Sequence, residues 1–147
     1  MASNHGTLRI GFTGSRHGLS QRQRAEVERL LRETAPAELH HGGCVGADAE
    51  AHDLALALGV PSIVVHRSVV LGLTADIQQD SERSVVTLLE PRKPLKRNRD
   101  IARAVDLLIA APATIEEIER SGTWSTVRFA RRCLPNVRVI VVPPSGF

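Results

Sequence analysis

Four short segments of this chain carry the residue types that hold phosphate groups. The first is Gly14-Ser15-Arg16 and the third is Arg97-Asn98-Arg99. Glycines let a ligand approach the backbone, hydroxyls cap helices, unpaired amides at a helix start attract anions, and two arginines flanking an asparagine can hold phosphate and hydroxyl groups together. The pattern therefore indicates an anion site. The second and fourth segments supply Gly42, Gly43, Gly46 and Asp48, and Ser121, Gly122, Thr123 and Thr126.

Each segment also has a plain structural interpretation. The Ser121 segment can be an ordinary helix N-cap, and the Arg97 segment can be a solvated basic turn in which Arg99 and Asp100 form surface ion pairs. Trp124, the only tryptophan, can stack on a nucleobase or be buried against a sheet. The residues alone leave these alternatives open.

Buried strands that lead into helices would position these segments. Residues 105–111 are apolar with little alternation, which is typical of a parallel strand buried on both faces. Residues 8–12 and 37–41 likewise run into glycine turns that precede amphipathic helices at 19–34 and 47–58, the second ended by Gly59. Because ligands bind at the carboxyl ends of parallel strands, we expect the three glycine-bearing turns to share one edge of the sheet.

The rest of the chain continues the alternation of strands and helices. We expect further strands at 60–65, 84–89 and 137–142, helices at 95–104 and 123–134, and a loop with a short helix at 67–82 that covers the sheet edge. The pattern predicts the α/β class: one domain over residues 1–147, with a Rossmann-like three-layer parallel sheet and helices on both faces.

Composition narrows the function classes. Hydrophobic residues make up 42% and charged residues 24%, and no apolar run reaches the roughly 20 residues that span a bilayer. No signal peptide is visible in residues 1–8, so we expect a cytoplasmic protein. The net charge of +3 permits phosphate-bearing ligands. Two cysteines and six histidines show no metal-ligand spacing, and neighbouring His40 and His41 should point to opposite sheet faces; we expect no metal.

Two common nucleotide sites are excluded by their motifs. The first turn reads Gly11-x-x-Gly14-x-x-x-Gly18 and lacks the G-x-G-x-x-G fingerprint, and the second strand ends in histidines where a ribose-binding acid would stand. The G-x-x-x-x-G-K-[ST] sequence of P-loop enzymes is absent. We therefore expect neither a nicotinamide dehydrogenase nor a P-loop enzyme, and no bound cofactor.

Taken in order, the segments GFTGSR, GGCVGADAEAH, KRNRDIA and SGTWST resemble a known superfamily over about residues 8–142. This is the SLOG superfamily, which unites the DNA-processing protein DprA with the LOG-type cytokinin riboside phosphate hydrolases; the small single-domain branch related to YspA and YpsA is most similar. The resemblance implies a Rossmann-like sheet whose loops bind nucleotides, nucleotide-derived ligands or single-stranded DNA, and it implies a homo-oligomer. It assigns ligand contacts to Gly14, Ser15, Arg16, Gly42, Gly43, Gly46, Asp48, Arg97, Arg99, Ser121, Gly122, Thr123 and Thr126.

One position departs from the hydrolase pattern. The last loop of LOG-type hydrolases reads P-G-G-x-G-T-x-x-E with a catalytic glutamate, and Thr126 stands at that position here. Without the carboxylate we expect binding, or sensing through binding, of a nucleotide or nucleotide-derived ligand. One alternative is a hydrolase of a nucleotide-like N-glycosidic or phosphate bond, with Asp48 or Glu50 as the acid. The other is DprA-like binding of single-stranded nucleic acid, which the aromatic content of 3% disfavours.

Overall fold

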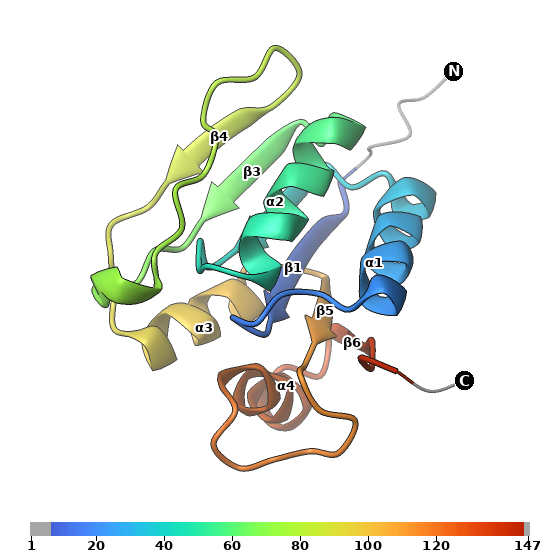
Figure 1. The fold of residues 1–147 in the computed structure, drawn as a ribbon, viewed down its shortest axis with the longest axis vertical. Helices are drawn as coiled ribbons and strands as arrows, with labels where there is room; N and C mark the ends of the chain where they lie inside the picture. Colours follow the sequence, from blue (N-terminus) through green and yellow to red (C-terminus); the bar gives the residue numbers. More distant parts are fainter. Residues whose placement is uncertain (1–6, 146–147) are drawn as a thin grey trace.

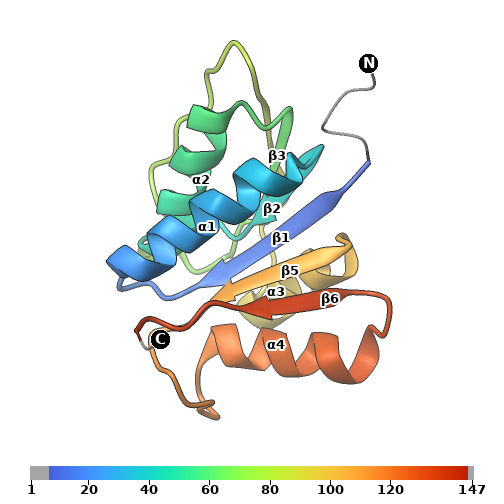
Figure 2. The same cartoon turned by 90° about the vertical axis from the view of Figure 1, so that its right-hand side faces the viewer.

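The computed structural model describes residues 7–145, which form a three-layer α/β/α sandwich (Figures 1 and 2). Six parallel strands form one sheet in the order β4-β3-β2-β1-β5-β6. Figure 2 shows α1 and α2 on one face and α3 and α4 on the other. The predicted fold class is confirmed. The strands are β1 (Arg9–Gly14), β2 (Glu38–His41), β3 (Ser62–Val65), β4 (Val85–Leu88), β5 (Leu107–Ala111) and β6 (Arg138–Val141), and the helices are α1 (Gln21–Thr34), α2 (Ala47–Leu58), α3 (Pro94–Arg103), α4 (Gly122–Cys133) and the short 3₁₀ helix η1 (Leu71–Leu73).

The interior strand β5 explains why the sheet is covered on both sides. All five of its residues are buried, and it pairs with β1 on one side and β6 on the other. A strand that is apolar at every position must have helices packed on both faces. The strand begins later than the apolar run predicts, since Val105 and Asp106 precede it. The Asp106 carboxylate instead accepts hydrogen bonds from the backbone and side chain of Arg9.

Local signals set the bounds of the first two helices. Ser20 caps α1 through its hydroxyl, which accepts from the Gln23 amide, and Gln23 bonds back to the Ser20 amide in a capping box. Helix α2 ends at Leu58 and is capped by Gly59, whose φ of 71° lies in the left-handed region. Helix α2 therefore has the bounds that its apolar spacing and terminal glycine predict.

The connection from β3 to β4 contains no α-helix. Residues 67–82 hold only η1, as the sequence predicts, but the segment lies on the α2 face of the sheet. Ile77 packs against the core beneath α2, and the Gln78 carbonyl oxygen accepts a 2.7 Å hydrogen bond from Nε2 of His52. This segment takes the place that a helix occupies in a regular βαβ unit.

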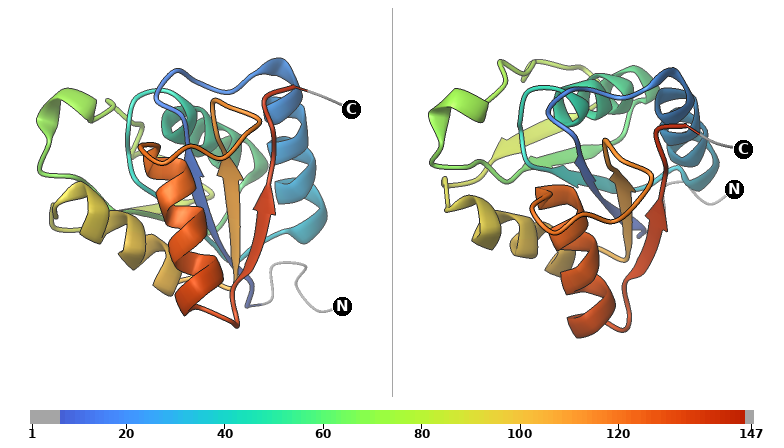
Figure 3. Two further views of the ribbon diagram at one scale, coloured as in Figure 1. Left: turned by 90° about the horizontal axis from the view of Figure 1, so that it is seen from below. Right: turned by 60° about the horizontal axis from the view of Figure 1, so that its bottom comes forward.

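The strand order reverses between β1 and β5, because β1 to β4 extend toward one edge of the sheet and β5 and β6 toward the other. At the carboxyl ends of this pair Gly14 lies opposite Ala111. Figure 3 shows the segments that follow β1 and β5 at the same end of the sheet. Open α/β sheets bind ligands at such a reversal.

No helix within residues 7–145 is long and apolar enough to cross a membrane.

Candidate functional site

A cavity of about 430 Å³ lies at the carboxyl ends of β1 and β5, and we call it the switch-point cavity. Its volume falls within the roughly 300–1,000 Å³ of small-molecule sites. All four sequence segments with phosphate-binding character contribute to its wall. The lining residues are Thr13, Gly14, Ser15, Arg16, His17, Cys44, Asp48, Leu73, Pro94, Arg97, Asn98, Ala113, Ile118, Arg120, Ser121, Gly122 and Thr123.

The turns after β1 and β2 are packed against each other through glycines. A Cβ on Gly14 would lie 2.6 Å from the Cβ of Ala47, and a Cβ on Gly46 would overlap the backbone carbonyl of Arg16. Gly46 also has a φ of 90°, and the Ala47 amide donates to the Ser15 carbonyl oxygen over 2.9 Å. Gly14 and Gly46 therefore allow the two turns to approach closely enough to form one wall.

The turn after β2 is organised around the carboxylate of Asp48. Its Oδ2 accepts from the amides of Gly42, at 3.1 Å, and Cys44, at 3.3 Å. A Cβ on Gly42 would lie 2.7 Å from Nη1 of Arg97 and 2.8 Å from Oδ2 of Asp48, so only glycine leaves room for both groups. Gly42 and Gly43 are buried outside the cavity wall, while Cys44 and Asp48 form part of it.

Burial dominates the electrostatics of this carboxylate. Asp48 is 6% exposed, and burial raises its pKa to about 6, against the opposing effects of the backbone amides and the Arg97 charge. Its second oxygen, Oδ1, is buried without a hydrogen-bond partner. Burial also raises the pKa of the Cys44 thiol, so this sulfur is a poor candidate for a thiolate nucleophile.

Arg97 is buried and most of its donors are occupied by the protein. Nη1 donates to the carbonyl oxygens of Gly42, at 2.7 Å, and His66, at 3.1 Å, and Nε donates to Oδ1 of Asn98. Nη2 lies 3.5 Å from the Cys44 sulfur. Because four of the five guanidinium N–H groups are used in this way, Arg97 mainly contributes charge and holds the carboxyl ends of β2 and β3 to α3.

The start of α4 presents unpaired amides to the cavity. The Ser121 hydroxyl accepts from the Trp124 amide, and the first helical bond runs from the Ser125 amide to the Ser121 carbonyl oxygen. Helix geometry therefore leaves the amides of Gly122 and Thr123, which both line the cavity, without an intrahelical acceptor. This is the arrangement that holds phosphate at helix N-termini.

Two residues of α4 fall outside the cavity wall. Thr126, which the sequence resemblance aligns with the hydrolase glutamate, is buried and donates its hydroxyl to the Gly122 carbonyl oxygen over 2.8 Å. Trp124 is also buried and donates from Nε1 to the Thr114 hydroxyl. Of the two alternatives for the tryptophan, burial against the sheet is therefore the one observed.

The rim of the cavity is positively charged. Arg16 and Arg120 are exposed and line the opening, and within residues 7–145 neither guanidinium has an ion-pair or hydrogen-bond partner. The loop that carries Arg120 is anchored to α4 by Arg128, which pairs with Glu117 and donates to the Ile118 and Glu119 carbonyl oxygens. Two unpaired arginines beside a helix N-terminus favour an anionic ligand.

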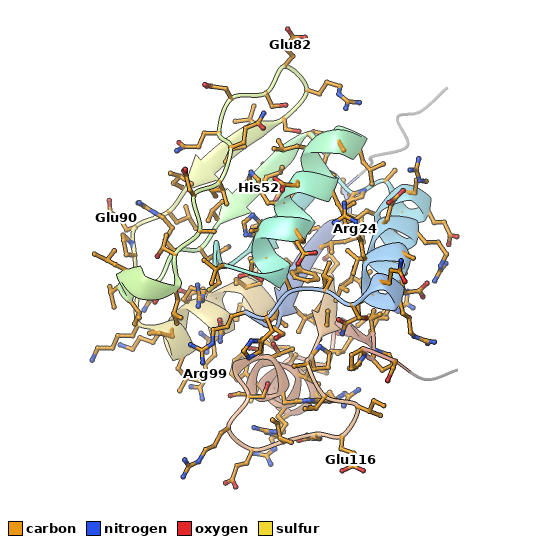
Figure 4. All side chains as sticks on the ribbon, viewed as in Figure 1. Arg24, His52, Glu82, Glu90, Arg99 and Glu116 are labelled. Atoms are coloured by element: carbon orange, nitrogen blue, oxygen red, sulfur yellow. The ribbon has the colours of Figure 1, made fainter. Side chains whose placement is uncertain are left out.

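The side chain of Arg99 lies away from the positively charged rim of the cavity. Its guanidinium carbon is 4.9 Å from the centre of the Phe129 ring, between α3 and α4 (Figure 4), and Arg103 approaches the same ring at 5.1 Å. The expectation that the head of Arg99 reaches the site is not met in this structure, because the aromatic face holds it.

The sequence therefore named nine of the wall residues in advance: Gly14, Ser15, Arg16, Asp48, Arg97, Asn98, Ser121, Gly122 and Thr123. The other five named residues do not line the cavity: Gly42, Gly43, Gly46, Arg99 and Thr126. Sequence reasoning missed Arg120 and His17, although each lies next to a named segment. Leu73, in η1, and Ile118, in the loop before α4, belong to segments without a motif, and only the fold brings them to the cavity.

A second hollow is larger but has a different character. It measures about 1020 Å³ and lies along the C-terminal half of α2, away from the carboxyl ends of β1 and β5. Its wall includes three acidic residues, Asp53, Asp80 and Glu82, and one basic residue, Arg83. The excess of negative charge disfavours a phosphate ligand. Among residues 7–145 no group of three or more possible metal ligands is found.

Neither a known protein family nor a curated protein sequence matches the chain. Solved structures do share its fold. The molybdenum cofactor binding protein from the phototrophic bacterium Rippkaea orientalis aligns with a TM-score of 0.65 at 18% identity over 95% of this chain and 78% of its own. The structural-genomics target TM1055 aligns with a TM-score of 0.54 at 15% identity over 84% of this chain and 68% of its own. The fold is Rossmann-like. At these identities the likeness concerns the fold alone.

Proposed function

We propose that the switch-point cavity binds a nucleotide or a nucleotide-derived ligand, and that the chain belongs to the SLOG superfamily whose motifs it resembles, in the small branch related to YspA and YpsA. The observation that carries the proposal is the meeting of the turn after β1 with the N-terminus of α4 at the strand-order reversal. In that place the phosphate accepts hydrogen bonds from the Gly122 and Thr123 amides and from the Ser15 hydroxyl.

Charge and shape support the same ligand class. Arg16 and Arg120 add two cations at the rim, where they screen the phosphate charge and attract it from solution. Leu73, Pro94 and Ile118 add apolar surface to the wall, against which a ring system can pack. A neighbour of the same fold is by its name a cofactor binding protein, which agrees with small-molecule binding at such a sheet.

A second candidate is hydrolysis of a nucleotide-like N-glycosidic or phosphate bond. It is favoured by one observation: Asp48 lines the cavity, has an unpartnered oxygen and has a pKa raised to about 6, as a proton-transfer group requires. Both carboxylate oxygens of Glu50 already have partners, because Oε1 accepts from the Leu19 amide and Oε2 pairs with Arg24. Release of free base from nucleoside monophosphates at about 1 per second, an ordinary enzymatic rate, would favour the hydrolase.

Thermal unfolding in the presence of a nucleotide panel tests the binding proposal. A ligand at about 100 times its dissociation constant should stabilise the folded state by roughly 2.7 kcal/mol. Arg16→Ala should weaken binding of the best ligand about 10-fold, because it removes one charge-assisted hydrogen bond. Arg131→Ala, in the last turn of α4, removes the same charge away from the cavity and should leave affinity unchanged. A panel in which no nucleotide raises Tm would contradict the proposal.

We further propose a homo-oligomer and a cytoplasmic location. Sedimentation of the purified chain tests the oligomer, and a single species at the monomer mass would contradict it.

A further inference from the structure

Asp48, a residue of the switch-point cavity wall, has a buried carboxylate oxygen without a hydrogen-bond partner in the described part of the chain. Asp48 is 6% exposed and its Oδ2 already accepts from two backbone amides, while Oδ1 has no partner within residues 7–145. Buried polar atoms are nearly always hydrogen-bonded, so one that is not calls for an explanation. Since Asp48 belongs to the wall of the cavity, the missing donor can come from a ligand.

The protein has little left to supply that donor itself. Arg97 is the nearest buried cation, but its Nε and Nη1 groups are occupied by Asn98, Gly42 and His66. The Cys44 amide already donates to Oδ2, and the Cys44 thiol, a weak donor that interacts with the Asp48 carboxyl, also lies 3.9 Å from the Gly42 carbonyl oxygen. An acceptor that its neighbours cannot satisfy is suited to recognise a hydroxyl or an amino group of the bound molecule.

The burial of the wall residues favours a hydroxyl over an amino group as the ligand donor to Oδ1. The deeply buried wall residues Thr13, Asp48 and Thr123 are polar, each no more than 8% exposed. Apolar surface lies toward the outside, where Ile118 is 45% exposed and Leu73 is partly exposed. A hydroxyl-rich sugar fits the polar depth, and a base fits the apolar rim. Within the described wall no phenylalanine or tryptophan is present to stack a base in the depth.

We propose that Oδ1 of Asp48 accepts a hydrogen bond from a ribose 2′- or 3′-hydroxyl, so that the cavity selects ribonucleotides over nucleotides without these hydroxyls. The inference rests on the proposed function, since it takes the phosphate to lie at the α4 N-terminus. It assigns a substrate class to the cavity and a selective role to Asp48. A site built to pair a hydroxyl discriminates strongly against the analogue that lacks it, because its own polar group is then left unpaired.

Calorimetric titration with AMP, GMP, CMP and UMP and with their 2′,3′-dideoxy analogues tests this role. For the ribonucleotide that binds best, the dideoxy analogue should bind the wild-type protein about 10- to 100-fold more weakly, as expected for the loss of a hydrogen bond to a charged group. Asp48→Asn keeps an oxygen for the Gly42 and Cys44 amides and removes the charge. It should lose most of the preference for the ribonucleotide. Asp53→Asn removes the same charge from the exposed side of α2 and should keep the full preference.

The other possible results of these titrations overturn the inference alone or the inference together with the proposed function. Equal wild-type affinity for a ribonucleotide and its dideoxy analogue overturns the inference and leaves the proposed function intact. An undiminished preference in Asp48→Asn also overturns it. Binding of none of the eight nucleotides overturns both the inference and the proposed function. Release of free base that depends on Asp48 would assign Oδ1 to a water molecule and so overturn the hydroxyl role. If Asp48→Asn fails to fold, the wild-type comparison alone decides.

Discussion

The guanidinium of Arg97 donates from Nη1 to the carbonyl oxygen of Gly42 over 2.7 Å and so joins α3 to the turn after β2. The same nitrogen donates to the His66 carbonyl oxygen at the end of β3. One buried side chain thus ties a helix on one face of the sheet to the carboxyl ends of two strands. Because Arg97 itself lines the cavity, as do Cys44 and Asp48 in the segment that follows β2, the shape of the proposed site depends on Arg97.

The first prediction compares two arginines of α3. Arg97→Ala leaves two buried carbonyl oxygens without donors, at roughly 1–3 kcal/mol each, so the free energy of unfolding should fall by about 2 kcal/mol or more. Arg99→Ala removes only an exposed contact with Phe129 and should cost about 0.5–1 kcal/mol. Urea unfolding measures both values. Similar losses for the two variants would show that the buried bonds of Arg97 are not what stabilises this region.

The second prediction concerns Gly46, through which the turn after β2 packs against the turn after β1. Gly46→Ala should destabilise the fold by about 1–3 kcal/mol and weaken ligand binding, because the position has a positive φ and a Cβ would overlap the Arg16 carbonyl. The matched control is Gly72→Ala in η1, where a Cβ would meet no atom within 4 Å. Thermal unfolding and titration of the two variants give the comparison. A Gly46→Ala protein with wild-type Tm and affinity would refute the close packing of the turns.

The third prediction concerns the loop before α4. Arg128→Ala removes an ion pair with Glu117 and two bonds to loop carbonyl oxygens, so amide hydrogen exchange in residues 114–121 should accelerate. Affinity for a nucleotide should fall several-fold because Arg120 is then less well positioned. Arg131→Ala should change neither quantity. Unaltered exchange in Arg128→Ala would mean that the loop is held by other contacts.

The fourth prediction concerns acid pH. Burial lowers the pKa of His41 well below its ordinary value of about 6.5 and lowers that of His66 to about 4. Both rings lie in hydrogen-bonded pairs, His41 with His52 (labelled in Figure 4) and His66 with His40. Below pH 6.5 these two histidines therefore bind more protons in the unfolded chain than in the folded one, so stability should fall as the pH decreases, by a net amount on the order of 2 kcal/mol between pH 7.5 and 5.0.

Asp48 acts in the opposite direction over the same range. Its folded-state pKa of about 6 lies above the unfolded value, so the folded chain gains a proton first and is stabilised as the pH falls toward 4. Asp48→Asn removes this contribution and should lose more stability on acidification than the wild type. Urea unfolding at the two pH values measures the difference. A smaller acid-induced loss in Asp48→Asn than in the wild type would contradict the raised pKa.

Much of the fold could be predicted because its signals are local. The run at 105–111, the apolar spacing of α2 and the glycine that ends it each reflect the immediate chain. His40 and His41 lie on opposite faces of β2, as strand alternation predicts, and pair with His66 and His52. The path of residues 67–82 could not be predicted, since it depends on contacts of Ile77 and Gln78 with α2, which are far away in sequence.

The candidate site was harder to predict from the sequence, because it too depends on contacts between residues far apart in the chain. The motif places Arg97 and Arg99 together, but they lie two positions apart on a helix and so face different sides of it. One is buried against two strand ends and the other lies over Phe129. The burial of Asp48 and the unpaired state of Arg120 likewise arise from the packing of loops that are distant in sequence.

The measurement that most directly tests the central claim is a nuclear magnetic resonance titration of the ¹⁵N-labelled protein with the nucleotide that binds best. The proposed phosphate position predicts the largest amide shifts at Gly122 and Thr123, accompanied by Ser15. Shifts confined to residues 78–83, along the acidic hollow beside α2, would contradict the claim. So would a saturable titration in which the amides of Gly122 and Thr123 do not move.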